Sequence, residues 1–272
     1  MPEVEKERTL AGQVALVTGS VQGIGAGIAK KFVEQGAKLV IHGLEKKQGE
    51  ATLSTLLAAG CDAILEICDL KDEANCRNLI RRTLQHFGQI DILVNNAGVY
   101  HRGNIENTSA ALWDEIFAVN VRAPFVLCQE AVKSMKGRQD MSPHRAAQRG
   151  CIINIGSVNA YIGQPKLLAY SASKGALMTL TRNLATTLTR DRIRVNQINP
   201  GWVLTEGEDY IESIGEGRGK NWLEGALKTR PFGRMLSPED IARAALFFAT
   251  NELITGAVLD YEQLTFGSPP EL

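Results

Sequence analysis

Short apolar runs alternate with longer amphipathic segments through most of this 272-residue chain. A run that is apolar throughout is typical of a strand buried on both faces of a sheet. Repeated strand–helix units imply a parallel sheet with right-handed crossovers. We therefore predict an α/β fold, with a doubly wound, mostly parallel sheet of seven strands and helices on both faces. The predicted strands are residues 14–17, 38–41, 63–67, 91–94, 151–155, 194–198 and 257–259.

The amphipathic segments between these strands predict the helices. Pro124 should bend or break the longest of them, because proline cannot donate to the helical ladder. With no repeat and no linker, we expect residues 1–272 to form one domain, in which 1–10 are an N-terminal extension. Residues 137–150 look like a polar surface loop, and the glycine-rich, acidic residues 201–229 look like a flexible lid over a substrate. The predicted helices are residues 24–35, 46–59, 72–87, 109–136 and 166–190.

Composition excludes several function classes. Lysine plus arginine equals aspartate plus glutamate at 30 each, so no basic excess argues for nucleic acid. No stretch approaches the ~20 apolar residues of a membrane span, and the charged first ten residues are unlike a signal peptide. The cysteines are odd in number and form no C-x-x-C pair, which favours reduced thiols. The histidines are scattered and show no ligand spacing, so we expect no metal. We expect a cytoplasmic protein that acts on a small molecule.

A glycine cluster follows the first predicted strand, in the sequence Thr18-Gly19-Ser20-Val21-Gln22-Gly23-Ile24-Gly25. Glycines between a strand and a helix allow a tight turn and close approach to a pyrophosphate at the helix N-terminus. An ordinary turn between strand and helix is the alternative. The strand–helix context favours dinucleotide binding.

Tyr170 and Lys174 are four residues apart in a predicted helix, so they share one face. A lysine cation near a phenol favours the phenolate and lowers its pKa toward a useful range for acid–base work. Ser157, at the end of a separate strand, can hydrogen-bond an oxygen on which charge develops. The trio predicts proton transfer to or from a substrate oxygen, although Y-x-x-x-K also arises by chance.

The order of these motifs, with Asn95-Asn96-Ala97-Gly98 after the fourth strand, resembles the short-chain dehydrogenase/reductase family over about residues 11–260. The resemblance implies a Rossmann-like fold and oxidoreductase activity. It implies that Tyr170 is the general acid–base and that Lys174 adjusts the pKa of Tyr170. Ser157 would orient the substrate, and Asn120 would hold a water molecule for proton relay. Asn95 would stabilise the central sheet. The implied cofactor contacts are Gly19, Gln22, Gly23, Ile24, Gly25, Leu44, Asp69, Leu70, Asn96, Ala97, Gly98, Tyr170, Lys174, Pro200, Gly201 and Val203.

The cofactor preference depends on residues that would meet the adenosine ribose. An acidic residue about 20 positions beyond the glycines hydrogen-bonds the ribose 2′-hydroxyl of NAD, whereas a nearby arginine binds the 2′-phosphate of NADP. Gly43 and Leu44 occupy these places, followed by Glu45, and Gln22 stands where NADP-using relatives often carry a cation. We therefore favour NAD over NADP.

The residues expected around the substrate are polar. Tyr100, His101 and Arg102 follow the N-N-A-G segment, Asn159 and Tyr161 follow Ser157, and Trp202, Glu206 and Asp209 lie in the segment 201–229. Such a lining favours a secondary alcohol or ketone on a sugar, polyol or similar hydroxylated molecule. Two alternatives are an NADPH-dependent 3-oxoacyl-thioester reductase serving an acyl carrier protein, and a nucleotide-sensing protein without catalysis.

The C-terminal strand departs from the family pattern. Many relatives end it with a Val-Asp-Gly-Gly run, whereas this chain has Leu259-Asp260-Tyr261-Glu262-Gln263. We expect a change in subunit packing or in the pocket floor, with simple drift of a surface end as the alternative. The resemblance also implies a homotetramer or homodimer, with subunit contacts through the helices that begin near Ser109 and Lys166.

Overall fold

The computed structural model describes residues 8–137 and 149–264. These residues form a seven-stranded sheet with the order β3-β2-β1-β4-β5-β6-β7, in which every neighbouring pair is parallel. The predicted doubly wound fold is confirmed. The strands are β1 Val14–Val17, β2 Lys38–Gly43, β3 Ala63–Ile67, β4 Ile92–Asn95, β5 Gly150–Ile155, β6 Ile193–Pro200 and β7 Val258–Tyr261.

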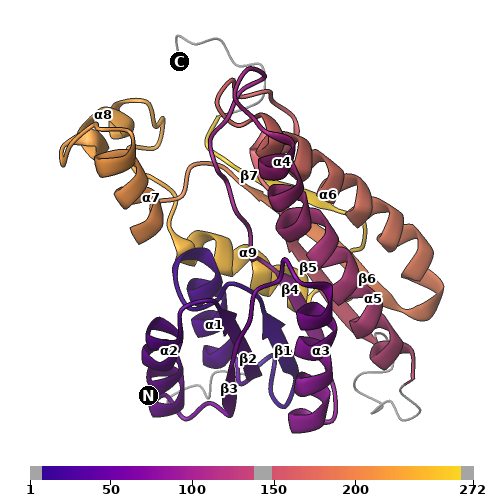
Figure 1. Ribbon diagram of the computed structural model, residues 1–272. Helices are drawn as coiled ribbons and strands as arrows, with labels where there is room; N and C mark the ends of the chain where they lie inside the picture. The colour runs from indigo at the N-terminus through magenta and orange to yellow at the C-terminus, as the bar shows by residue number, and fades with distance from the viewer. Residues whose placement is uncertain (1–7, 138–148, 265–272) are drawn as a thin grey trace.

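Helices cover both faces of the sheet (Figure 1). The segment that carries α7 and α8 stands apart from the helical layers, as Figure 1 shows. The helices are α1 Gly23–Glu34, α2 Lys46–Ala58, α3 Glu73–Phe87, α4 Ala110–Phe117, α5 Ala123–Lys136, α6 Leu168–Leu188, α7 Glu206–Tyr210, α8 Trp222–Lys228 and α9 Pro238–Thr250.

Two apolar cores lie on opposite faces of the sheet. Because successive strand residues point to opposite faces, Ala15 and Val17 pack with α1 and α9, whereas Leu16 packs with α3, α5 and α6. Burial of this kind contributes about 25 cal/mol per Å² of apolar surface. The two-sided burial explains why the strands are apolar throughout, and it holds their carboxyl ends rigid.

The long helix predicted over residues 109–136 is divided in the structure. α4 ends at Phe117, a π-helical turn occupies Ala118–Arg122, and α5 begins at Ala123 with Pro124 in its first turn. Proline has no backbone N–H, so it fits the first turn of a helix but interrupts a continuous one. Such π-turns are frequent at functional sites, and this one contains Asn120.

The segment 201–229, expected to be a flexible lid, is partly helical. It contains α7, a π-helical turn at Ile211–Gly215, and α8. Trp222 and Ala226 of this segment form a small core with Met235, which follows it. Most of the polar loop expected at 137–150, and most of the N-terminal extension, lie outside the described residues. Within the described ranges, no helix is both long and apolar enough to cross a membrane.

Candidate active site

The candidate site lies where the strand order changes direction. β1 is hydrogen-bonded to β2 on one side and to β4 on the other, so the connections after β1 and β4 run to opposite faces. Open α/β sheets bind ligands in the crevice at the carboxyl ends of such strands. The glycine turn follows β1 and the Asn95-Asn96-Ala97-Gly98 segment follows β4, which brings both motifs to one crevice.

The glycine turn is a tightly packed cradle. Gly19 and Gly23 have φ angles of +61° and +57°, a region that favours glycine because a Cβ would clash there. A Cβ built at Gly25 would lie 2.3 Å from the Gly19 carbonyl oxygen. Asn96 Nδ2 donates to the carbonyl oxygens of Thr18 and Gly19 at 2.8 and 2.9 Å. Asn96 therefore holds the turn through its side chain.

The N-terminus of α1 suits a negatively charged group. Gln22 is the N-cap residue, but its side chain caps no backbone N–H of the described helix, and the first turn carries no acidic residue. Unsatisfied N–H groups and the helix dipole favour a phosphate at such an end. Together with the glycine cradle, this fits the pyrophosphate of a dinucleotide.

His42 supports the same turn and was not predicted from the sequence. Its Nδ1 accepts a hydrogen bond from the Gly19 N–H at 3.1 Å, and its Nε2 lies 3.0 Å from the Cys68 carbonyl oxygen. Nε2 must carry the proton for both bonds to form, so the imidazole is neutral. Burial lowers the pKa of His42, opposed by the Cys68 carbonyl and the charge of Asp69. A polar residue at the end of an otherwise apolar strand was the available signal.

We expect nucleotide binding to weaken as the pH falls below about 6.5. Because the pKa of His42 is lowered in the folded protein, its support of the turn is complete above the unfolded value of about 6.5. That support is lost as the pH falls through the lowered pKa, when Nδ1 becomes a donor and repels the Gly19 N–H. Titration calorimetry with the nucleotide at several pH values measures this.

His42→Gln should remove most of this pH dependence, because glutamine does not titrate in this range. His86→Gln is the matched control, since His86 is exposed. An equally steep pH dependence in His42→Gln would show that another group is responsible.

Tyr170, Lys174 and Ser157 meet at the carboxyl end of β5. Lys174 is buried, donates from Nζ to the Ile155 carbonyl oxygen at 2.9 Å, and lies 5.6 Å from the centre of the Tyr170 ring. The Ser157 hydroxyl lies close enough to the Tyr170 phenol to act on its pKa. The structure thus brings the three side chains together.

The electrostatics of the trio differ from the simple expectation. Burial raises the pKa of Tyr170, the hydrogen bond from Ser157 lowers it, and the charge of Glu208 raises it. Burial lowers the pKa of Lys174 to about 8. The expectation that Lys174 lowers the pKa of Tyr170 is therefore not met in the free protein, because desolvation of the phenol outweighs the other influences.

A buried polar chain holds Ser157 in place. Asn199 Oδ1 accepts from the Ser157 backbone N–H at 3.1 Å and from Gln197 Nε2 at 2.7 Å. Gln197 lies 2.8 Å from the Thr181 hydroxyl, which accepts from Asn154. Asn154 in turn accepts from Asn95 at 2.8 Å. Buried hydrogen-bond networks of this kind rigidify a core, so the orientation of Ser157 is linked to four neighbouring elements. Asn95 Oδ1 accepts no hydrogen bond from the described residues.

Asn120 connects the β4 segment to the helix of the catalytic trio. Its Oδ1 accepts from the Val99 N–H at 2.9 Å, and its Nδ2 donates to the Val99 carbonyl and to the Ser173 hydroxyl. A Cβ at Gly98 would lie 3.3 Å from Asn120 Oδ1 and 3.5 Å from Lys174 Nζ. These side chains therefore meet beside Gly98, and a relay water on Asn120 stays a proposal.

The remaining expected cofactor residues take different positions. Leu44 is 61% exposed at the crevice edge, whereas Leu70 is buried in a core, so only its backbone is available to a ligand. The Asp69 carboxylate accepts from the Lys71 N–H and pairs with its ammonium. Gly201 lies against the Glu262 carboxylate. Ala97 and Gly98 follow β4 beside the glycine turn, Pro200 is the last residue of β6, and Val203 follows it.

The side chains predicted to contact the substrate divide into two groups. His101 is exposed, and Asn159 Oδ1 is buried without a hydrogen bond from any described residue. Tyr161 instead interacts with Asp260 and Asn199. Trp202 donates its indole N–H to Glu208 at 2.6 Å. The structure thus directs Tyr161 and Trp202 toward protein partners.

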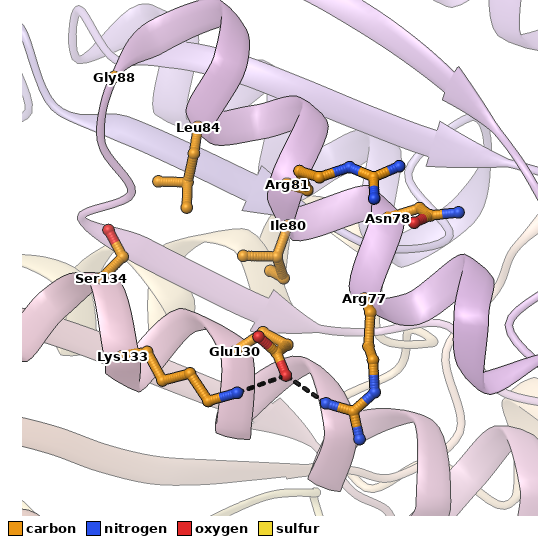
Figure 2. A pocket seen from close by; sticks show the side chains of 9 residues that line it. All are labelled: Arg77, Asn78, Ile80, Arg81, Leu84, Gly88, Glu130, Lys133 and Ser134. Carbon is orange, nitrogen blue, oxygen red and sulfur yellow. Dashed lines mark hydrogen bonds and ion pairs between the residues drawn. The ribbon is translucent and has the colours of Figure 1, made fainter.

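A separate groove of about 490 Å³ lies between α3 and α5 (Figure 2). Glu130 is held there between Arg77 and Lys133. Gly88, which lines it, ends α3 and precedes the amino end of β4, so the groove lies away from the carboxyl ends where Tyr170 sits. In the described part of the chain, no cluster of three possible metal ligands occurs.

Comparison with known proteins identifies the family. Residues 19–262 match the family model described as Enoyl-(Acyl carrier protein) reductase. An uncharacterised oxidoreductase of Thermotoga maritima is 35% identical over 92% of this chain and 96% of its own length. L-fucose dehydrogenase of Oryctolagus cuniculus is 34% identical over 88% of this chain and 80% of its own. A 3-oxoacyl-(acyl-carrier-protein) reductase of Chlamydia pneumoniae is 32% identical over 89% and 91%.

Solved structures agree with this assignment. A dehydrogenase/reductase of Sinorhizobium meliloti has a TM-score of 0.80 and 33% identity, covering 93% of this chain and 96% of its own. A short-chain dehydrogenase of Burkholderia cenocepacia in complex with NADP has a TM-score of 0.81 and 29% identity, covering 94% and 98%. The fold and crevice define a nicotinamide-dependent oxidoreductase. The chain belongs to the short-chain dehydrogenase/reductase family.

Proposed function

We propose that this oxidoreductase interconverts a secondary alcohol and a ketone on a sugar, polyol or similarly hydroxylated molecule. The single observation that carries the reaction type is the meeting of Tyr170, Ser157 and Lys174 beside the dinucleotide crevice. When bound, the nicotinamide exchanges a hydride with the carbon of the substrate. A panel of polyols, aldoses, hydroxy acids and acetoacetyl thioesters tests the substrate class, and activity confined to the thioesters would reject it.

Each residue of the trio has a distinct part in the proposed proton transfer. The Tyr170 phenol gives its proton to the carbonyl oxygen during reduction, and its phenolate takes the hydroxyl proton during oxidation. Ser157 hydrogen-bonds the same oxygen and so stabilises charge that develops there. Because burial raises the pKa of Tyr170, the phenolate needs a neighbouring cation. Lys174, with a pKa of about 8, supplies that charge below this pH.

A thioester reductase is the second candidate function. The Chlamydia pneumoniae relative acts, by its name, on a 3-oxoacyl group carried by a protein. Such an enzyme needs an open path for a long acyl chain, whereas here Tyr170 packs edge-on against Tyr100, and the carboxylate-rich α7 approaches the Tyr100 hydroxyl. The same substrate panel separates the two functions.

We propose that NAD is preferred over NADP. Leu44 and Glu45 follow β2, where the adenosine ribose would lie. The side-chain oxygen of Gln22 accepts a hydrogen bond from Gln48 Nε2 at 2.7 Å. A 2′-phosphate would meet the Glu45 carboxylate, and repulsion should lower kcat/KM for NADP by about tenfold, or about 1.4 kcal/mol. Initial rates with both nucleotides measure this ratio.

The variant Leu44→Arg should raise kcat/KM for NADP by about tenfold, because arginine binds phosphate in bidentate geometry. Leu44→Met is the matched control, since it keeps an apolar side chain of similar volume. A wild-type enzyme that is more efficient with NADP would contradict the preference. The NADP complex of the Burkholderia cenocepacia protein shows that a related fold accepts that nucleotide.

We also propose assembly into a homodimer or homotetramer through the surface that contains α4, α5 and α6. Phe125 on α5 is 45% exposed, and aromatic side chains of this kind are enriched in subunit interfaces. Light scattering on the purified protein would count the subunits, and a monomer at micromolar concentration would contradict the assembly.

A further inference from the structure

Glu208 places a negative charge near the phenols of Tyr100 and Tyr170. The Tyr100 and Tyr170 rings are 6.1 Å apart in an edge-on arrangement. A Cβ at Gly207 would lie 3.9 Å from the Tyr100 hydroxyl, so α7 approaches the pocket at this point. The charge of Glu208 raises the pKa of both phenols. Glu208 therefore acts on the region that a substrate must occupy to reach Tyr170.

One oxygen of this carboxylate is occupied and the other is available. Oε1 accepts the Trp202 indole N–H at 2.6 Å. Oε2 accepts no hydrogen bond from the residues of ranges 8–137 and 149–264, and no cation in those ranges forms an ion pair with it. Burial also raises the pKa of Glu208. Oε2 is not among the buried side-chain atoms without a partner, so it is open to solvent and can accept from water or from a substrate hydroxyl.

Two other carboxylates of the same segment, those of Glu212 and Glu216, form ion pairs. Glu212 pairs with Arg102 and Arg218, at 3.1 and 2.8 Å. Glu216 pairs with Arg102 at 2.7 Å and with Lys166 at 3.3 Å. These pairs fix the segment against residues that precede Tyr170. Glu208 differs from them because it forms no ion pair with a described residue, although the charges of Arg102 and Arg218 still act to lower its pKa.

The C-terminal segment braces the residue that holds Glu208. The Arg230 guanidinium lies 5.6 Å from the centre of the Trp202 ring, and it pairs with Glu262 at 3.5 Å. A Cβ at Gly201 would lie 2.0 Å from Glu262 Oε2, so this carboxylate packs on the Gly201 backbone just before Trp202. The departure from a glycine pair at this end of the chain therefore has a structural consequence at Trp202.

We infer that Glu208 selects the substrate, with its Oε2 accepting a hydrogen bond from a hydroxyl group on the carbon next to the reacting carbon. Trp202, Arg230 and Glu262 are positioning residues for it. This inference rests on the proposed function and deepens it, because a vicinal diol offers such a hydroxyl. A carboxylate or phosphate at the same place on a substrate would be repelled.

Cyclohexanol, cyclohexane-1,2-diol and 2-aminocyclohexanol test the inference, because they differ only at the neighbouring carbon. The wild-type enzyme should prefer the diol to cyclohexanol. Glu208→Ala should lower kcat/KM for the diol by about 10-fold to 100-fold, the range for a hydrogen bond to a charged group. The lower kcat/KM for the diol should come from a higher KM. The kcat/KM for cyclohexanol should change by less than about threefold.

Two further variants separate selection from folding. Glu208→Gln keeps the shape and an acceptor oxygen, so its loss on the diol should be smaller than that of Glu208→Ala. Glu224→Ala changes an exposed carboxylate of α8 and should leave the diol preference unchanged. Glu262→Gln should also reduce the preference for the diol over cyclohexanol, but less than Glu208→Ala does. It weakens only the pairing with Arg230, which packs on the Trp202 ring.

The outcomes distinguish this inference from the proposed function. Equal losses on the diol and cyclohexanol in Glu208→Ala would overturn the selection role, as would a larger loss on the amino alcohol, which would indicate a cation subsite. Either result leaves the alcohol–ketone reaction standing. A wild-type enzyme that reduces acetoacetyl thioesters but oxidises neither alcohol would overturn the proposed substrate class and this inference together.

Discussion

Tyr170→Phe should lower kcat by about 1,000-fold, within the 10²- to 10⁴-fold range of general acid–base catalysis, while nucleotide affinity changes by less than about threefold. The substitution removes only the phenolic oxygen. It keeps the ring that lies 5.6 Å from Lys174 and 6.1 Å from Tyr100. Steady-state rates and calorimetric titration of the nucleotide measure the two quantities on the same preparation.

Tyr210→Phe is the matched control, because Tyr210 is 62% exposed and lies on α7 outside the trio. Its kcat should equal that of the wild type. Near-normal turnover of Tyr170→Phe would remove Tyr170 from the proton transfer. A parallel loss of nucleotide affinity would instead show that the phenol acts mainly in binding.

Gly25→Ala should weaken nucleotide binding by about 100-fold. The added Cβ would lie 2.3 Å from the Gly19 carbonyl oxygen and 2.5 Å from Asn96 Nδ2, so the turn must open. Overpacking of this kind costs about 1–3 kcal/mol and can cost more when backbone must move. A 100-fold loss corresponds to about 2.7 kcal/mol. Titration calorimetry measures it, with circular dichroism to show that the sheet is intact.

Gly225→Ala provides the contrasting glycine. It lies in α8, where an added Cβ meets no described atom within 4 Å, so alanine should stabilise the helix slightly and leave nucleotide affinity unchanged. Wild-type affinity in Gly25→Ala would show that the dinucleotide does not use this turn. An equal loss in both variants would point to a general effect of substitution.

The topology and the composition of the site could be predicted because both depend on local sequence. A strand that is apolar throughout, such as Val14–Val17, indicates burial on both faces of the sheet. The residues of the glycine turn all lie within one strand–helix unit, so a local motif identifies the turn. The i, i+4 spacing of Tyr170 and Lys174 on α6 placed them on one face. The separation of α4 from α5 was anticipated from Pro124, although the π-helical turn was not.

The contacts made across the fold could not be predicted. His42 supports Gly19 only because β2 lies beside β1, and the Glu262–Arg230–Trp202 contacts join segments that are distant in the sequence. The balance of influences on the Tyr170 phenol also depends on how deeply the fold buries it. Burial and long-range pairing are properties of the folded chain, so no single motif encodes them.

A crystal structure with nucleotide and cyclohexane-1,2-diol bound tests the central claim most directly. We predict that the reacting oxygen lies within about 2.6–3.2 Å of both the Tyr170 phenolic oxygen and the Ser157 hydroxyl, the distance that proton transfer requires. The pyrophosphate should lie on the glycine turn at the N-terminus of α1. A diol bound with its oxygen away from both Tyr170 and Ser157 would contradict the account.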